Sequence, residues 1–294
     1  MSLLELFVEV DDFVQKFEGW AAQQQLSDKA KRGPKPLLSV SEVMTLTIHF
    51  HQEGYRDFKH YYQNHVCKQL VVEFPGLVSY GRFVELIKSA LLPLCAYLRS
   101  RFGRCTGTAF VDSTPLAVCH NRRINRHKVF KDWAARGKSS MGWFYGFKLH
   151  LIVNDVGELL SVHLTPGNTD DRKPLEFETV GKHLFGKLFG DKGYLSQTLF
   201  EKLHERGLEL ITSLRKNMKA RLMPLADRIL LRKRFIIETI NDQLKNISQI
   251  EHTRHRSPAN FAVNLIAGLI AYTLQPKKPS IRFPKEVTQL PALI

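Results

Sequence analysis

The stretch Thr108-Ala-Phe-Val-Asp-Ser-Thr-Pro-Leu-Ala-Val118 decides how the rest of the sequence is interpreted. It is an apolar, β-prone run with one carboxylate, Asp112, and strands of this composition are usually buried on both faces of a sheet. A buried ionised carboxylate is costly unless a positive group meets it. Two interpretations stay open at this point. Either Asp112 caps a turn where Pro115 ends the strand, or it belongs to a charged site.

Further strands and helices alternate along the chain after this stretch. The apolar and β-branched runs predict strands at 143–153, 158–165, 187–190 and 208–214. The turn at 154–157 joins the first two of these, and helical patterns follow residue 172 and cover 199–206. This order predicts an α/β fold with a mixed sheet flanked by helices.

The sequence before residue 104 is helical instead. Apolar residues at helical spacing predict a helix at the start of the chain, and Ser39 and Glu42 form a capping box for a second one. Gly54 fits the end of that helix, and Ser79 the start of a later one. A basic linker over 27–36 precedes these short helices. They suit a helix-turn-helix-like DNA-binding region, and a plain helical subdomain is the alternative.

The charge of the chain points to a polyanionic partner. Lys and Arg number 43 against 28 Asp and Glu, for a net charge of +15. The excess is concentrated at 122–138 and 215–234, so double-stranded DNA is the expected partner.

Several other classes of protein are disfavoured. The four cysteines form no CxxC pair, and no histidine pair has partners at zinc-like spacing, which predicts reduced thiols in a cytoplasmic protein. The first residues lack the basic start of a signal peptide. The apolar run 261–274 is too short to span a bilayer, so we expect a core helix and no membrane partner.

Three carboxylates form the candidate site. Asp191 follows an apolar strand tip, as Asp112 does, whereas Glu238 is predicted on a helix face with Arg234 and Lys245. Glu238 could equally be an exposed residue paired with Arg234. Two metal ions that cleave a phosphodiester require carboxylates from separate elements to converge, and these three acids supply such a set.

The chain resembles bacterial insertion-sequence transposases of the DDE type, which have an RNase H-like core. The resemblance rests on Phe110-Val-Asp-Ser-Thr114, Tyr145-Gly-Phe-Lys-Leu-His150, Gly167-Asn-Thr-Asp-Asp-Arg172 and Gly190-Asp-Lys-Gly-Tyr194. The third motif of that family is Tyr, Arg, Glu and Lys at fixed spacing. It falls here on Leu231, Arg234, Glu238 and Lys245, so only its tyrosine is missing.

The resemblance implies a function and a division of the chain. Asp112, Asp191 and Glu238 would hold two Mg²⁺ or Mn²⁺ ions, and Arg234, Lys245 and Lys192 would contact DNA phosphates. The implied parts are a helical DNA-binding region over 1–104, an RNase H-like catalytic domain over 105–275 and a tail over 276–294. A homodimer would bind the terminal inverted repeats of its element, then cleave and join DNA strands in the bacterial nucleoid.

Two alternative functions remain open at the level of sequence. A metal-dependent nuclease of the same fold would cleave DNA without joining it, and a catalytically silent derivative would only bind DNA. Within the site, Asp170 and Asp171 are the densest acidic pair. Their place in a polar loop beside Arg172 predicts that they shape the loop and do not bind metal.

Overall fold

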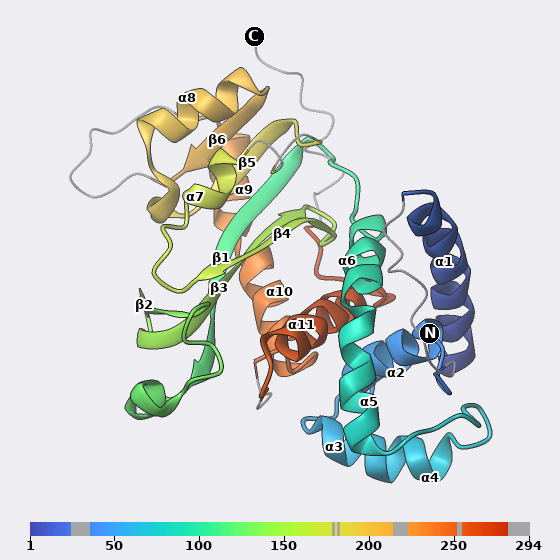
Figure 1. Cartoon of the computed structure of the whole chain (residues 1–294). Helices are drawn as coiled ribbons and strands as arrows, with labels where there is room; N and C mark the ends of the chain where they lie inside the picture. The colour runs from blue at the N-terminus through green and yellow to red at the C-terminus, as the bar shows by residue number, and fades with distance from the viewer. Residues whose placement is uncertain (25–35, 178–179, 181–182, 214–222, 252–254, 282–294) are drawn as a thin grey trace. The chain divides into compact units, whose positions relative to one another are not determined.

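The structure of the chain is a computed structural model that describes residues 1–24, 36–177, 180, 183–213, 223–251 and 255–281 (Figure 1). It divides into two compact units. Unit 1 comprises Met1–Phe102, Leu116–Phe147 and Asp242–Pro276, and unit 2 comprises Gly103–Pro115, Lys148–Asn241 and the residues from Lys277 onward. The three parts predicted from the sequence stay a prediction.

A six-stranded sheet with the order β2-β3-β1-β5-β6, in which β4 also pairs with β3, confirms the predicted mixed α/β class. The strands are β1 (Thr108–Cys119), β2 (Ala135–Ser139), β3 (Gly142–Asn154), β4 (Leu159–Pro166), β5 (Gly186–Gly190) and β6 (Leu208–Thr212). In unit 2, β5 runs parallel to both β1 and β6. Gly157, at a φ of 80°, makes the turn between β3 and β4 because its missing side chain permits a positive φ.

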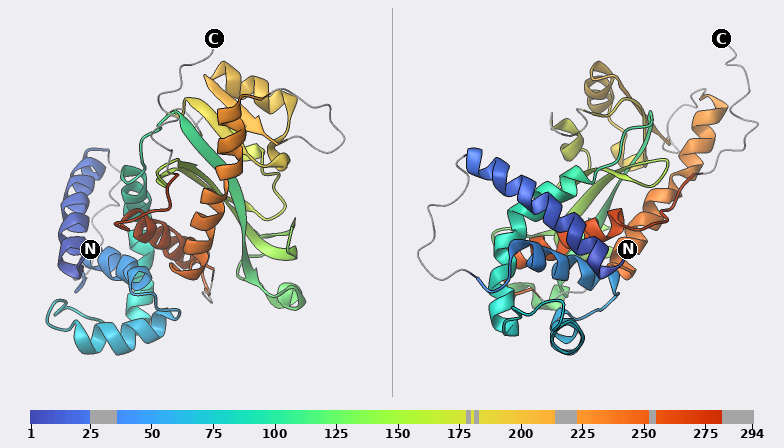
Figure 2. Two further views of the ribbon diagram at one scale, coloured as in Figure 1. Left: turned by 180° about the vertical axis from the view of Figure 1, so that it is seen from behind. Right: turned by 90° about the vertical axis from the view of Figure 1, so that its right-hand side faces the viewer.

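The helices of unit 2 cover both faces of this part of the sheet. They are α7 (Lys173–Glu176), η4 (Lys192–Tyr194), α8 (Gln197–Glu205), α9 (Leu225–Lys233) and α10 (Phe235–Asn246), whose last residues belong to unit 1. Leu175 of α7 and Leu203 of α8 share a buried cluster with Ala109 and Leu188. The next residues along β1 and β5 point to the opposite face, where α9 packs on β5 and β6 and crosses in front of the sheet in the view from behind (Figure 2).

Pro115 does not end β1, which corrects one of the two interpretations of Asp112. The strand continues to Cys119, and Asp112 lies inside it. The pairing with β5 covers only Thr108, Ala109 and Phe110 on β1. Pro115 lies beyond that pairing.

Unit 1 is mainly helical, as the sequence predicts. Its helices are α1 (Leu3–Gln23), α2 (Val40–Gln52), α3 (Phe58–His60), η1 (Tyr61–Val66), α4 (Cys67–Gln69), α5 (Tyr80–Leu86), η2 (Ile87–Ala90), α6 (Leu91–Ser100), η3 (Asn121–Arg126) and α11 (Pro258–Thr273). Helix α11 packs on α2 and α6 and is the predicted core helix. Strand β2, which pairs with the start of β3, lies in a stretch where the sequence predicts a basic loop.

Local signals in the sequence fix the helix ends of unit 1. The capping box of Ser39 and Glu42 is formed as predicted, with both reciprocal hydrogen bonds, and Gly54 follows α2 at a φ of 67°. Ser79 caps α5. The sequence does not predict that one turn of the next helical run, η1, is a π-helix.

No helix among the described residues is long and apolar enough to cross a membrane. The basic linker over 27–36, apart from Pro36, lies outside the described residues, as do 215–222 of the second basic run and His252.

Candidate active site

Strand register places two of the predicted carboxylates side by side. Phe110 on β1 is the register partner of Phe189 on the parallel strand β5, and their rings stack with centroids 5.5 Å apart. Asp112 follows two residues later inside β1, and Asp191 follows two residues after Phe189, directly after the end of β5. Neighbouring strands lie about 4.8 Å apart, which brings the two backbones close at this edge. Asp191 also accepts a hydrogen bond from the backbone N–H of Gly193 at 2.8 Å.

The helical side of the site is built around Asp112. Asn241 of α10 donates to its carboxylate at 3.3 Å, and an Nη atom of Arg234 lies 3.8 Å from its other oxygen. Arg234 also pairs with Glu238 at 2.5 Å. It lies between α9 and α10 instead of inside one continuous helix, which is a correction to the predicted helix. The spacing from Arg234 to Asn241 nevertheless places these side chains on the side of α10 that faces the sheet.

The surroundings of Asp112 disfavour its ionised form. The net effect of its surroundings raises the pKa of Asp112 to about 6. Burial is the largest cause, and the negative charges of Asp191 and Glu238 act in the same direction, whereas Arg234 and a hydrogen bond from the backbone of Ser113 lower the pKa. A divalent cation would remove the repulsion between the three acids, so their chemistry fits a hard metal ion.

The three carboxylates do not form one tight cluster. Among the described residues, only His49, Glu53 and His65 bring three ligand atoms within 4.8 Å of one another. Glu238 is turned toward Arg234, and its side chain is 53% exposed. The site is therefore open, and its three acids are Asp112, Asp191 and Glu238. Arg234, which contacts Asp112 and Glu238, supplies part of the positive charge between the acids.

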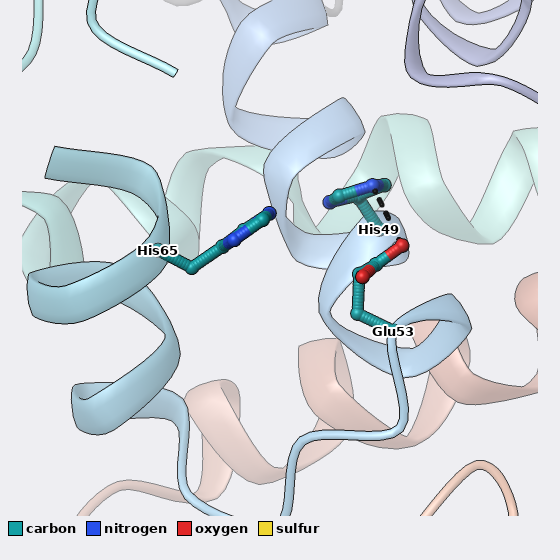
Figure 3. Close-up of side chains that lie close together, drawn as sticks. All are labelled: His49, Glu53 and His65. Carbon is teal, nitrogen blue, oxygen red and sulfur yellow. Dashed lines mark ion pairs between the residues drawn. The ribbon is translucent and has the colours of Figure 1, made fainter. Parts of the chain in front are cut away.

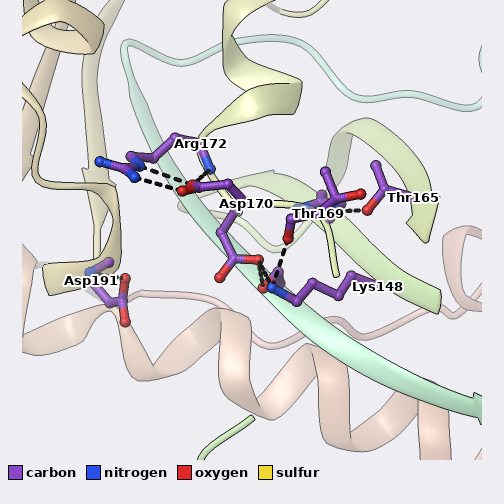
Figure 4. A network of polar contacts seen from close by, with 10 residues as sticks. Lys148, Thr165, Thr169, Asp170, Arg172 and Asp191 are labelled. Carbon is purple, nitrogen blue, oxygen red and sulfur yellow. Dashed lines mark hydrogen bonds and ion pairs between the residues drawn. The ribbon is translucent and has the colours of Figure 1, made fainter. Parts of the chain in front are cut away.

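A polar network lies directly beside Asp112. The carboxylate of Asp171 accepts from the hydroxyl of Ser113 and from Lys148, both at 2.8 Å, and Lys148 also donates to the carbonyl of Thr169 (Figure 4). Asp170 instead turns to Arg172, whose backbone N–H and guanidinium it accepts from. The two adjacent carboxylates thus bind different partners, and Asp171 reaches the residue next to Asp112.

Tyr194 is a residue of this site that the sequence reasoning does not single out. Its ring belongs to the buried cluster of unit 2, and its hydroxyl is buried without a hydrogen-bond partner among the described residues. Burial raises the pKa of Tyr194 well above its ordinary value, and the charges of Asp112, Asp171 and Asp191 add to the effect. The hydroxyl is therefore a neutral donor near the acids. Its position three residues after Asp191 in Gly-Asp-Lys-Gly-Tyr is the available signal in the sequence.

A basic hollow opens next to Asp191. It has a volume of about 490 Å³ and is lined by Asp191, Lys192, Ser213, Arg228, Leu231, Arg232 and Arg234. Four of these side chains are cationic, which favours a phosphate group. The sequence predicts that Lys192 and Arg234 contact DNA, whereas it gives no separate prediction for Arg228 and Arg232. Leu231 lines the same hollow.

Lys245, the last predicted site residue, belongs to unit 1. Its amino group lies 3.2 Å from a carboxylate oxygen of Glu251. Glu251 also accepts from the backbone N–H of Ala117. Lys245 therefore contributes to an ion pair inside unit 1, and its predicted contact with DNA stays a prediction.

Comparison with known families agrees with this arrangement. The family model described as the transposase DDE domain matches residues 102–258, which is more than half of the chain and includes all three carboxylates. Curated proteins gave no significant match. The mixed sheet and its flanking helices agree with the RNase H-like fold of DDE domains. By this match, the chain belongs to the DDE transposase family.

Proposed function

We propose that the chain is the transposase of a bacterial insertion sequence, which binds the terminal inverted repeats of its element, cleaves there and joins the freed 3′ ends to target DNA. The observation that supports the proposal is that the charges of Asp191, just after β5, and of Glu238, on α10, both act on the buried carboxylate of Asp112 in β1. Acids from three elements that surround one edge of a sheet are what metal-dependent phosphodiester chemistry requires.

In the proposed site, Asp112, Asp191 and Glu238 hold two divalent metal ions, Mg²⁺ or Mn²⁺. The chemistry that such ions supply is activation of the attacking oxygen and stabilisation of the leaving oxygen. Asn241 and the Asp171 network orient the carboxylate of Asp112 through Oδ2 and through Ser113. Arg234 exchanges its contact with Glu238 for a phosphate oxygen when DNA enters.

The basic hollow supports a position for the DNA strand. Lys192, Arg228 and Arg232 line it together with Asp191, so a phosphate bound there lies next to an acid of the proposed metal site. Because arginine binds phosphate through two parallel hydrogen bonds, these side chains would fix the strand in register with the acids. The helical region over 1–104 is proposed to bind the terminal repeats, and a dimer to pair two ends.

Strand transfer tests this proposal against a nuclease of the same fold. Purified full-length protein is mixed with a DNA duplex from the flank of its gene that ends in a free 3′-hydroxyl, with a supercoiled plasmid as target, in Mg²⁺. The proposal predicts plasmid molecules joined to the labelled duplex. The same duplex with a 3′-dideoxy end is the control and gives no joined product. Cleavage of the flanking DNA without any joining would favour the nuclease, and binding without cleavage would favour a silent derivative.

A further inference from the structure

Two histidines and a glutamate meet in unit 1, and none of them belongs to the site described above. His49 and Glu53 lie one turn apart on and just after α2, and His65 comes from the π-helix η1 (Figure 3). One ligand atom of each lies within 4.8 Å of the other two. The rings of His49 and His65 stack with centroids 5.9 Å apart. The sequence places His65 sixteen positions after His49, a spacing that does not suggest a shared ion.

The hydrogen bonds of His49 prepare one ring nitrogen for an ion. Its Nδ1 lies 2.9 Å from the hydroxyl of Tyr61, and its Nε2 lies 3.3 Å from a carboxylate oxygen of Glu53. When Nδ1–H donates to Tyr61, Nε2 carries a lone pair that faces the carboxylate. Two acceptors in contact repel each other unless a cation lies between them. Metal-bound histidines commonly donate their second N–H in this way, which fixes the tautomer.

The distances suit a tetrahedral ion. Ligands at 2.0–2.1 Å from Zn²⁺ lie about 3.3–3.4 Å apart when the geometry is tetrahedral. The separation of 3.3 Å between His49 Nε2 and Glu53 meets this value without rearrangement. His49 is buried and Glu53 is exposed, so the cluster opens to solvent on the side of the glutamate. Solvent can therefore supply a fourth ligand.

The π-helix explains how His65 joins the cluster. A π-helical turn holds an extra residue, shifts the side chains that follow it, and is frequent at functional sites. Tyr61 and His65 both belong to η1, and their rings lie 5.6 Å apart. The same irregular turn thus supplies one ligand and the hydrogen-bond partner of another.

We propose that His49, Glu53 and His65 form a binding site for a divalent transition metal, Zn²⁺ by its ligand set, that is separate from the carboxylate site of unit 2. Two imidazoles and one carboxylate select ions such as Zn²⁺ over Mg²⁺, which prefers oxygen ligands. The ion ties η1 to α2 and so stabilises the helical unit. This inference does not depend on the proposed transposition reaction.

Metal titration of the full-length protein tests the inference. Untagged protein is stripped with a chelator and titrated with Zn²⁺ by calorimetry, and with Co²⁺ while its visible absorption is recorded. The variant Asp112→Ala, used as the background, weakens binding at the carboxylate site. We expect one tight Zn²⁺ per chain, a tetrahedral Co²⁺ spectrum, and a rise in melting temperature on loading.

Substitutions locate the ion. Glu53→Gln, which is exposed and should fold normally, and His65→Ala should each weaken Zn²⁺ at least tenfold and change the Co²⁺ spectrum. Tyr61→Phe, which removes only the hydroxyl, should weaken Zn²⁺ by about 10- to 100-fold. The matched control is His60→Ala, an exposed histidine of the same helical run whose ring nitrogen hydrogen-bonds to the side chain of Asn64. It should leave affinity and spectrum unchanged.

Two results would overturn the inference. One is the absence of a tight Zn²⁺ site in the Asp112→Ala background. The other is an unchanged affinity and Co²⁺ spectrum in Glu53→Gln, since this variant keeps the shape of the side chain and removes only its charge.

Discussion

Asp112→Asn should make the metal-free protein more stable while it abolishes DNA cleavage. Burial raises the pKa of Asp112 from its ordinary value of 3.8 to about 6. A difference of this size corresponds to about 3 kcal/mol by which the folded state disfavours the ionised carboxylate at neutral pH. Asparagine removes that charge and can still accept from Asn241. The pKa of about 6 already includes the attraction of Arg234, so we expect a net gain of about 1–3 kcal/mol in the free energy of unfolding.

Urea unfolding in the presence of EDTA at pH 8 measures this gain. The pKa of Asp112 is higher in the folded state than in the unfolded state, so the stability of the original protein rises as pH falls through 6 toward 3.8. The difference between the two proteins should therefore shrink at pH 5. Asp12→Asn, an exposed change on α1, should stay within about 0.5 kcal/mol and is the control. A clear loss of stability in Asp112→Asn at pH 8 would refute the reasoning, because Arg234 and Asn241 would then stabilise the charge.

Three further predictions concern other parts of the chain. Asp171→Asn should retain metal-dependent cleavage at about a tenth to a hundredth of the original rate, because the substitution disturbs the contacts with Ser113 and Lys148 but removes no metal ligand. If the variant folds and binds DNA normally but cleaves as little as Asp112→Asn, Asp171 is itself a ligand. The logarithm of DNA affinity should fall linearly with the logarithm of salt concentration, with a slope of about 0.9 for each phosphate contact. If the affinity measured by fluorescence anisotropy does not change with salt, the basic residues are not the DNA-binding surface. Burial lowers the pKa of His150 to about 4, so this histidine is neutral in the folded protein. Its contribution to stability is present above pH 6.5 and is lost as pH falls toward 4. Between pH 7 and pH 5, the free energy of unfolding measured in urea should therefore fall by about 2 kcal/mol less in His150→Gln than in the original protein.

The fold was predictable wherever a local signal determines it. The capping box of Ser39 and Glu42 predicts the start of α2, because it satisfies two backbone N–H groups within four residues. The apolar composition of the runs around Asp112 and Asp191 predicts the strands β1 and β5. Strand β2 escaped prediction because Arg136 and Lys138 are charged, and its pairing with β3 is a tertiary effect that composition does not reveal.

The site was predictable in its residues but not in its contacts. The sequence shows acids at strand tips, whereas the matching of Asp112 with Asp191 depends on the register of two strands that lie far apart in the chain. The hydrogen bond from Ser113 to Asp171 and the buried hydroxyl of Tyr194 arise from packing in the same way. No spacing rule connects these residues, so only the folded chain reveals them.

Cleavage by single-alanine variants of the three acids tests the central claim most directly. DNA from the flank of the gene is incubated with full-length protein and Mg²⁺, and binding is measured in parallel with Ca²⁺ in place of Mg²⁺. The account predicts that Asp112→Ala, Asp191→Ala and Glu238→Ala each abolish cleavage and bind DNA at least as tightly as the original protein, because each removes a metal ligand and a negative charge near the phosphates. Substantial Mg²⁺-dependent cleavage by any one of them would remove that residue from the catalytic set and contradict the account.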